Sequence, residues 1–355
     1  MQKILFVIGS MQSGGAERVA SRLCSHWAEL QNEVTLLTGS SVDSDFYKVD
    51  QRVNRKSLEF NYNNNNMLDK IFEQFERFFK IQYALKRDDY NTIVLSATDI
   101  SIRFMLNLFF SRKKVIICEH NNYYAINSTF KRLARIVFFR RANYLFLLTE
   151  LDRKAYLTRG FLHSKLVVMP NPLGIPQPEF IDRQPSKKLL AVGRLTKQKS
   201  FDRLLKIFEL LDDTYTLTIV GNGEDESKLK KLSNELDISD RVFFAGIQKN
   251  IDYFYRSHDI LLMTSIYEGL PMVIGEANAY SLPVIAYNCP TGPKEMIQDG
   301  LSGFLINDDD FKGFVEKINY IFSNLDIYKY MSNRAYIASK GTTIEQVAES
   351  WNDYL

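Results

Sequence analysis

The chain has 355 residues, 45% of them hydrophobic, which indicates two domains of ordinary size that each bury a full core. No run approaches the ~20 apolar residues of a membrane-spanning helix, and the three widely separated cysteines exclude a disulfide-rich secreted domain. The net charge of +3 divides unevenly: residues 1–180 hold 25 Lys and Arg against 17 Asp and Glu, whereas residues 181–355 hold 20 against 25. The basic first half favours an anionic partner.

Short apolar strands alternate with amphipathic helices along the first half of the chain. The chain opens on a strand rather than a signal peptide, because its apolar run is only about five residues long. The predicted strands are residues 3–8, 33–38, 91–97, 114–118, 144–149 and 166–169, and the predicted helices are residues 15–30, 67–87, 99–111 and 130–141. This alternation is typical of a parallel sheet covered on both faces. The polar patch at residues 61–66 predicts a flexible loop.

The pattern breaks at residues 169–186, which hold five of the nine prolines and predict a semi-rigid connector. The second half is predicted to contain strands at 188–192, 215–220, 241–246, 259–263, 282–286 and 303–306, and helices at 200–211, 225–236, 271–280, 311–322, 325–339 and 343–354. We therefore predict an α/β protein with two Rossmann-like, doubly wound domains, residues 1–170 and 171–355. The final helix is expected to be able to pack back on the first domain. Ligands of such sheets bind beyond the carboxyl ends of the strands, which predicts a cleft there.

Two groups in the first half follow predicted strands. Gly14 and Gly15 precede a helix whose free N–H groups could meet an anion, although the glycine spacing is not that of a dinucleotide-binding motif. His120 ends the strand in VIICEH, where its ring nitrogens could bond to a sugar hydroxyl or a carbonyl. A tight turn in the first case, and a structural or surface histidine in the second, are the alternatives.

The second half contains a cationic turn and a pair of carboxylates. Arg194 follows a strand and a glycine, and Lys199 stands five residues later at a predicted helix start, so the two could hold a diphosphate. A solvated basic turn is the alternative. Glu268 and Glu276 lie in SIYEGLPMVIGEANAY, the first in a loop and the second in a helix that Pro271 can begin. Carboxylates accept paired hydrogen bonds from vicinal hydroxyls, which both sugars and ribose present.

These motifs, taken in order, resemble those of the family 4 glycosyltransferases of GT-B fold. The matching segments cover nearly the whole chain: SGGAER, EHNN, VGRLTKQKSFDRL, GNGEDESKL, FFAGIQKN, EGLPMVIGE and CPTGPKEMIQDGLSGFLI. Within that family the chain looks most like enzymes that extend a polyprenyl-diphosphate-linked oligosaccharide in bacterial glycan or O-antigen assembly. The resemblance implies a retaining transfer from a nucleotide sugar, most simply UDP-N-acetylhexosamine or UDP-hexose.

The resemblance also implies a role for each residue of the donor site. Glu276 would bind the ribose, Glu268 the donor sugar, and Arg194 and Lys199 the diphosphate. The other expected contacts are Gly14 and Gly15 beside the diphosphate, His120 along the reacting sugar, Gly246 and Ile247 at the base, and Gly269 and Leu270 at the donor. No cofactor is expected, and no metal either, because the cations already neutralise the diphosphate. The acidic clusters at Asp43 to Asp45 and Asp308 to Asp310 are therefore not expected to hold one.

The basic helix at residues 130–141 interleaves cations with aromatic side chains, as does the region of residues 67–87. Lys131, Arg132 and Arg135 are expected to face an anionic membrane or a lipid diphosphate, with the protein in the cytoplasm at the inner face of the membrane. Aromatic side chains that face the sheet, with cations in water, are the alternative. No nucleic-acid partner is expected.

Three other functions remain open from the residues alone. A sugar-nucleotide epimerase would need acids or bases placed to abstract a proton, and none stands out. A non-catalytic scaffold is disfavoured by the joint presence of the cations, carboxylates and histidine. A dinucleotide oxidoreductase is disfavoured by the glycine spacing.

Overall fold

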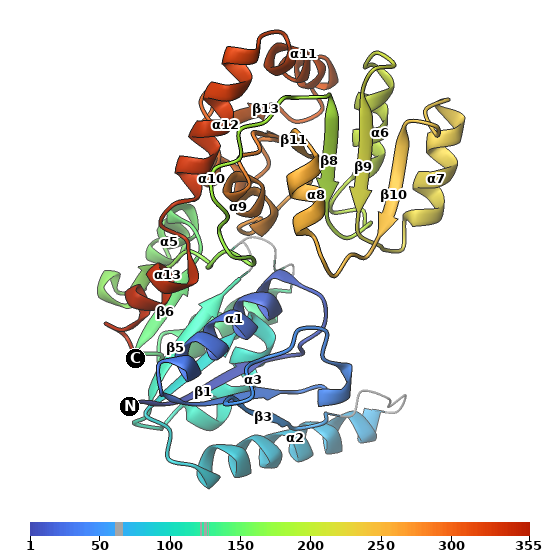
Figure 1. The fold of residues 1–355 in the computed structure, drawn as a ribbon. Helices are drawn as coiled ribbons and strands as arrows, with labels where there is room; N and C mark the ends of the chain where they lie inside the picture. The colour runs from blue at the N-terminus through green and yellow to red at the C-terminus, as the bar shows by residue number, and fades with distance from the viewer. Residues whose placement is uncertain (61–66, 121–122, 124–125, 127) are drawn as a thin grey trace. The chain divides into compact units, whose positions relative to one another are not determined.

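The computed structural model describes residues 1–60, 67–120, 123, 126 and 128–355. The predicted polar loop at 61–66 and the asparagines of the EHNN segment, Asn121 and Asn122, lie outside the described residues. Contacts divide the chain into two units, one made of Met1–Gly174 with Ile344–Leu355 and the other of Ile175–Thr343. Figure 1 shows a sheet flanked by helices in each unit.

The N-terminal unit is built on a parallel sheet of seven strands in the order β3-β2-β1-β4-β5-β6-β7. The strands are β1 Lys3–Ile8, β2 Glu33–Thr38, β3 Asn54–Ser57, β4 Thr92–Ser96, β5 Lys114–Glu119, β6 Tyr144–Leu147 and β7 Leu166–Val168. The helices are α1 Gly15–Glu29, α2 Met67–Arg87, α3 Thr98–Leu108, α4 Thr129–Phe139, α5 Glu150–Leu157 and α13 Ile344–Trp351, with 3₁₀ turns at Val42–Ser44 and His163–Lys165. The strand order turns back at β1 and β4, where ligands of such sheets bind.

Helices cover both faces of this sheet because its central strands are apolar on both sides. Val7 of β1 lies between Leu37 and Leu95 in the register, and all three are buried. Right-handed crossovers place α1 on one face and α2, α3 and α4 on the other. The returning helix α13 packs on α1, with the Trp351 ring 5.1 Å from Trp27.

The C-terminal unit repeats the design with six parallel strands in the order β10-β9-β8-β11-β12-β13. The strands are β8 Lys188–Val192, β9 Thr216–Val220, β10 Val242–Gly246, β11 Ile260–Met263, β12 Val284–Tyr287 and β13 Gly303–Ile306. The helices are α6 Phe201–Glu209, α7 Glu226–Glu235, α8 Asp252–Ser257, α9 Met272–Ala279, α10 Pro293–Met296, α11 Phe311–Phe322 and α12 Leu325–Ser339. The predicted α/β fold class is confirmed, and every strand predicted from the sequence is present within a few residues.

Four elements were not predicted. The edge strand β3 has the sequence NRKS, which is polar throughout and lacks the apolar residues that indicate a strand. Arg55 within it forms an ion pair with Asp45, with Nε 2.7 Å from Oδ2. The helices α5, α8 and α10 are short, at four to eight residues, and give too few turns for periodicity to indicate them.

Candidate functional site

The turn after β8 holds the predicted cations of the C-terminal unit. Gly193 N donates to the Val220 carbonyl, and Leu195 N donates to the Asn222 carbonyl, so this turn packs on the turn after β9. Gly221 lies there at a positive φ of 137°, and a Cβ atom on it would collide with the Gly193 carbonyl oxygen. Only glycine allows the two backbones to approach this closely.

Arg194 and Lys199 differ in what they contact. Arg194 is exposed and forms no ion pair with a described residue, so its guanidinium is free to meet a ligand. Lys199 precedes α6, and its Nζ lies 2.5 Å from Oε1 of Glu268. The side chains of Lys199 and Glu268 are only 17% and 7% exposed, respectively. A buried carboxylate needs such a partner, since desolvation penalises an unpaired charge.

The loop that carries Glu268 is fixed from two sides. Gln198 Nε2 donates to the Tyr267 carbonyl at 2.9 Å, and Ile266 N donates to the Gln198 carbonyl at 2.9 Å. From the other side, Thr291 Oγ1 donates to the Glu268 carbonyl at 2.5 Å. Gln198 was not predicted as a site residue, because nothing in KQKS indicates which loop its side chain reaches.

Glu276 lies in the second turn of α9, a helix that is buried along most of its length. Its Oε2 accepts a hydrogen bond from the hydroxyl of Tyr255 at 2.8 Å, and both side chains are almost fully buried. The Tyr255 ring stacks on Tyr280 with centroids 5.5 Å apart. Tyr255 belongs to α8, a helix that the sequence analysis did not predict, so this partner was missed too.

The end of β10 supplies the other predicted donor contacts of this unit. Gly246 has a positive φ of 66°, which favours glycine, and its carbonyl accepts from Gly221 N at 2.9 Å. The register of β10 shifts between Phe244 and Gly246, and Ile247 beyond it is about half exposed. Gly269 and Leu270 follow Glu268 in its loop, and a Cβ atom on Gly292 would collide with the Gly269 carbonyl oxygen.

The predicted glycines of the N-terminal unit stand at the start of a helix. Gly14 is the extended residue before α1, and Gly15 is the first residue of that helix. As the N-cap residue, Gly14 has no side chain to cap α1; its carbonyl accepts from Arg18 N at 3.1 Å, and the Glu17 carboxylate of the first turn lies beside it. The first N–H groups of a helix can bind an anion.

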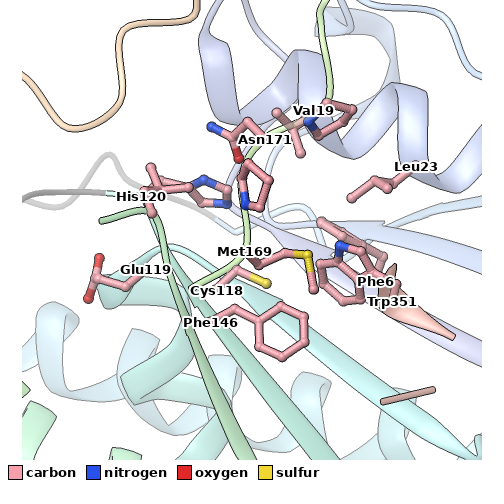
Figure 2. Close-up of a pocket in the computed structure, with 13 residues that line it drawn as sticks. Phe6, Val19, Leu23, Cys118, Glu119, His120, Phe146, Met169, Asn171 and Trp351 are labelled. Carbon is pink, nitrogen blue, oxygen red and sulfur yellow. The ribbon is translucent and has the colours of Figure 1, made fainter. Parts of the chain in front are cut away.

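His120 lines a small pocket within the N-terminal unit (Figure 2). The pocket has a volume of about 20 Å³, which is room for about one water molecule. Met169, Asn171 and Trp351 also line it, and Asn171 is a further polar group that the sequence analysis did not select.

Both ring nitrogens of His120 are buried and bond to no described residue. Burial lowers the pKa of His120 to about 4, because desolvation disfavours the charged imidazole. The neighbouring Glu119 is buried as well, and it accepts a hydrogen bond from Thr98 Oγ1 at 2.6 Å. A neutral imidazole can both donate and accept, which suits it to a hydroxyl or carbonyl.

The structure corrects one expectation about the basic helix α4. Arg135 is 0% exposed, so it does not face a membrane or a lipid diphosphate. Its Nη2 donates to the Tyr123 carbonyl at 3.0 Å, and its guanidinium lies 4.2 Å from the Tyr123 ring centroid. Lys131 and Arg132 are exposed, as expected, with Lys131 paired to Asp99 at 2.9 Å and Arg132 Nε bonded to the Ile126 carbonyl at 2.6 Å.

The acidic clusters are engaged with arginines. Arg203 Nη1 lies 2.7 Å from Asp308 and 2.6 Å from Asp309, while Asp45 pairs with Arg55. Among the described residues, no cluster of His, Cys, Asp and Glu has the arrangement of a metal site. Nor does any described helix have the length and apolarity to cross a bilayer.

Comparison with known proteins identifies the family. Residues 13–174 match the family described as Glycosyltransferase Family 4, and residues 177–338 match the one described as Glycosyl transferases group 1. Over the whole of both chains, the protein is 30% identical to amylovoran biosynthesis glycosyltransferase AmsD of Erwinia amylovora. The chain belongs to glycosyltransferase family 4.

One further relative and one solved structure match nearly the whole chain. An α-1,4-N-acetyl-D-galactosaminyltransferase of Campylobacter jejuni, whose name gives an undecaprenol-diphosphate-linked saccharide, is 27% identical over 99% of this chain and 97% of its own. The structure of Anabaena HepE in complex with UDP-glucose covers 99% of both chains with a TM-score of 0.81 at 17% identity. The predicted family and GT-B fold are thus confirmed.

Proposed function

We propose that the protein is a retaining hexosyltransferase that moves a sugar from a UDP-sugar to a polyprenyl-diphosphate-linked saccharide during bacterial surface polysaccharide assembly. The observation that carries the proposal is the buried Lys199–Glu268 pair beside the exposed Arg194, with Glu276 held by Tyr255 in the same unit. The names of the Erwinia and Campylobacter relatives support the polysaccharide role and the lipid-linked acceptor. The HepE complex supports UDP as the nucleotide.

The two carboxylates take different parts of the donor in this proposal. Glu268 can accept hydrogen bonds from sugar hydroxyls through whichever carboxylate oxygen Lys199 leaves available. Glu276 accepts hydrogen bonds from the ribose hydroxyls, and the Tyr255 bond holds its carboxylate in one rotamer for them. Gly246 and Ile247 contact the uracil, while Gly269 and Leu270 contact the rest of the donor.

The reaction breaks the bond between the anomeric carbon and the UDP oxygen and forms a bond from that carbon to an acceptor hydroxyl. Attack comes from the face that UDP leaves, and the leaving phosphate oxygen takes the acceptor proton, so the anomeric configuration is retained. Arg194 and Lys199 stabilise the charge that develops on the diphosphate, a task for which no metal is required. A covalent sugar adduct trapped on Glu268 would overturn this route.

The N-terminal unit supplies the groups that resemblance assigns to it. Gly14 and Gly15 offer the start of α1 to the diphosphate, and the neutral His120 offers a hydrogen bond to the reacting sugar. The acceptor and an anionic membrane meet the exposed Lys131 and Arg132. On this proposal the protein works in the cytoplasm as a peripheral enzyme of the membrane's inner face.

The test is UDP release from a panel of UDP-sugars, with and without a short polyprenyl-diphosphate-sugar acceptor. We expect acceptor-dependent release from one donor, an N-acetylhexosamine or hexose, with retained configuration in the product's proton NMR spectrum. Release without an acceptor would indicate a hydrolase. Isomerisation of the donor sugar without release of UDP would indicate an epimerase, and no turnover of any nucleotide sugar would leave a scaffold.

A further inference from the structure

Helix α2 exposes a stripe of aromatic side chains and buries an ion pair. Phe72, Phe75, Phe79 and Tyr83 form one stripe along it and are all exposed, Phe72 at 75%. On the side packed against its own unit, the first half of the helix buries the Glu73–Arg77 ion pair, with the charged atoms 3.0 Å apart. The second half packs Ile81 and Leu85 in the core. A helix of a water-soluble surface ordinarily buries its large apolar side chains. The exposed stripe of α2 would therefore be stabilised by an apolar environment outside the protein.

The two neighbouring helices continue this apolar surface. Phe110, just beyond α3, is 90% exposed, and Phe130 near the start of α4 is 78% exposed. Arg103 of α3 bonds to Gln74 of α2 at 3.3 Å, and α3 packs on α4, so the three helices form one layer on the same face of the sheet. We name Phe72, Phe75, Phe79, Tyr83, Phe110 and Phe130 the aromatic face. Groups of exposed aromatic side chains on one surface mark interaction sites.

Cations flank the aromatic face, and the exposed acids Glu76 and Asp99 beside it are paired with Lys80 and Lys131. Residues 129–141 hold five Lys and Arg and no acid, and Arg112, Lys113 and Lys114 directly follow Phe110 and Ser111. Arg112, Arg132 and Arg141 are exposed. Aromatic rings beside cations match the interface of a bilayer that contains anionic lipid. A second copy of the chain fits less well, because a two-fold interface would bring the same cationic patch from both copies together.

We propose that the aromatic face inserts into the interfacial layer of an anionic bilayer, with Arg112 and Arg132 against lipid phosphates. The proposal rests on the lipid-linked acceptor of the proposed function and names the surface that meets the lipid. It assigns the main apolar contribution to α2, whereas the cations of α3 and α4 select anionic lipid. Arg135 has no direct part in it, because its charge is buried.

The experiment is co-sedimentation of the full chain with phosphatidylcholine vesicles, with and without phosphatidylglycerol. Wild-type protein should bind the vesicles that contain phosphatidylglycerol. The variant F72S/F75S/F79S should bind them at least ~10-fold more weakly, because apolar burial in the interface is lost. The matched control L210S/L325S/I337S replaces three exposed apolar residues of the C-terminal unit and should bind as wild type does. The variant R112E/R132E should lose the preference for phosphatidylglycerol.

Three results would overturn the inference. The first is a wild-type protein that does not sediment with either vesicle. The second is an F72S/F75S/F79S variant that binds as wild type does. The third is a wild-type dimer that this variant converts to a monomer in sedimentation velocity, which would make the aromatic face an interface between copies. Calorimetric titration with UDP, without vesicles, separates this inference from the proposed function. If the protein binds UDP but not vesicles, only the proposed membrane surface is wrong. If it binds vesicles but no nucleotide, only the proposed function is wrong.

Discussion

Glu268 and Glu276 are two buried carboxylates, and each is held by a side chain that is distant in sequence. Lys199 reaches Glu268 across 69 positions, and Tyr255 reaches Glu276 across 21. Residue type and motif spacing indicated both carboxylates and Lys199 from the sequence. The partners Tyr255 and Gln198 could not be predicted, because their contacts depend on how separate loops fold together.

Arg135 was expected to be exposed, but its side chain in α4 is buried. The predicted helix 130–141 has so many cations that Lys131, Arg132 and Arg135 were all expected to face a membrane or a lipid diphosphate. The rings of Tyr123 and Tyr156 and the Tyr123 carbonyl surround its guanidinium. An arginine in a core is stable only with such partners, and sequence periodicity cannot indicate them.

His120 makes the folded protein sensitive to acid. Its pKa is about 4 in the folded protein and about 6.5 when solvated, so between these values only the unfolded chain takes up the proton. The free energy of unfolding should therefore fall as pH drops from about 6.5 to about 4. In H120Q this contribution is absent, so urea unfolding of the variant should depend less on pH in that window. Parallel pH profiles for wild type and H120Q would contradict the burial of the ring.

At the scale of elements, the long strands and helices followed from periodicity alone. The pattern placed α2 at residues 67–87 and α12 at residues 325–339, with the bounds that the structure has. The same pattern did not show which side of α2 faces away from the protein. A 3.6-residue period gives the same helix whether its apolar stripe meets the core or a membrane.

Gln198 connects two loops of the C-terminal unit, and its loss should affect the reaction without unfolding the protein. Its side chain joins the turn before α6 to the loop of Glu268, so Q198A should loosen the Lys199–Glu268 pair. One hydrogen bond contributes about 1 kcal/mol, so we expect about a fivefold lower kcat/KM for the UDP-sugar, with a Tm lowered by no more than about 4 °C. The control Q298A removes a surface glutamine that bonds to Arg334 and should leave kcat/KM unchanged. Equal kinetics in both variants would show that the loop holds its position without Gln198.

At the scale of the whole molecule, the chain leaves its N-terminal unit at Gly174 and returns to it at Ile344. The return is secured by Trp351, whose ring lies 5.1 Å from Trp27 of α1 and 4.5 Å from Phe146 of β6. The same side chain lines the pocket of His120. The N-terminal unit is therefore incomplete without the last helix, although most of its sequence lies before residue 175.

Replacing Trp351 should destabilise one unit selectively. W351A leaves a cavity between α1, β6 and α13, and such changes typically cost about 3–5 kcal/mol. We expect the thermal unfolding of the variant to separate into two transitions, with the N-terminal unit unfolding first. Added UDP should raise the transition of the C-terminal unit more than that of the N-terminal unit, because most of the proposed UDP contacts lie in the C-terminal unit. A single transition, lowered as a whole, would instead show that the two units unfold together.

The central claim is that the C-terminal unit holds a nucleoside diphosphate through Glu276 and the Arg194–Lys199 cations. Calorimetric titration of the full chain with UDP, UMP and GDP tests it most directly. We expect UDP to bind, and UMP to bind more weakly because it lacks a phosphate. The variant E276Q should bind UDP at least ~10-fold more weakly, because a charged ribose acceptor is lost. Absence of UDP binding in folded wild-type protein, or equal affinity of E276Q and wild type, would contradict it.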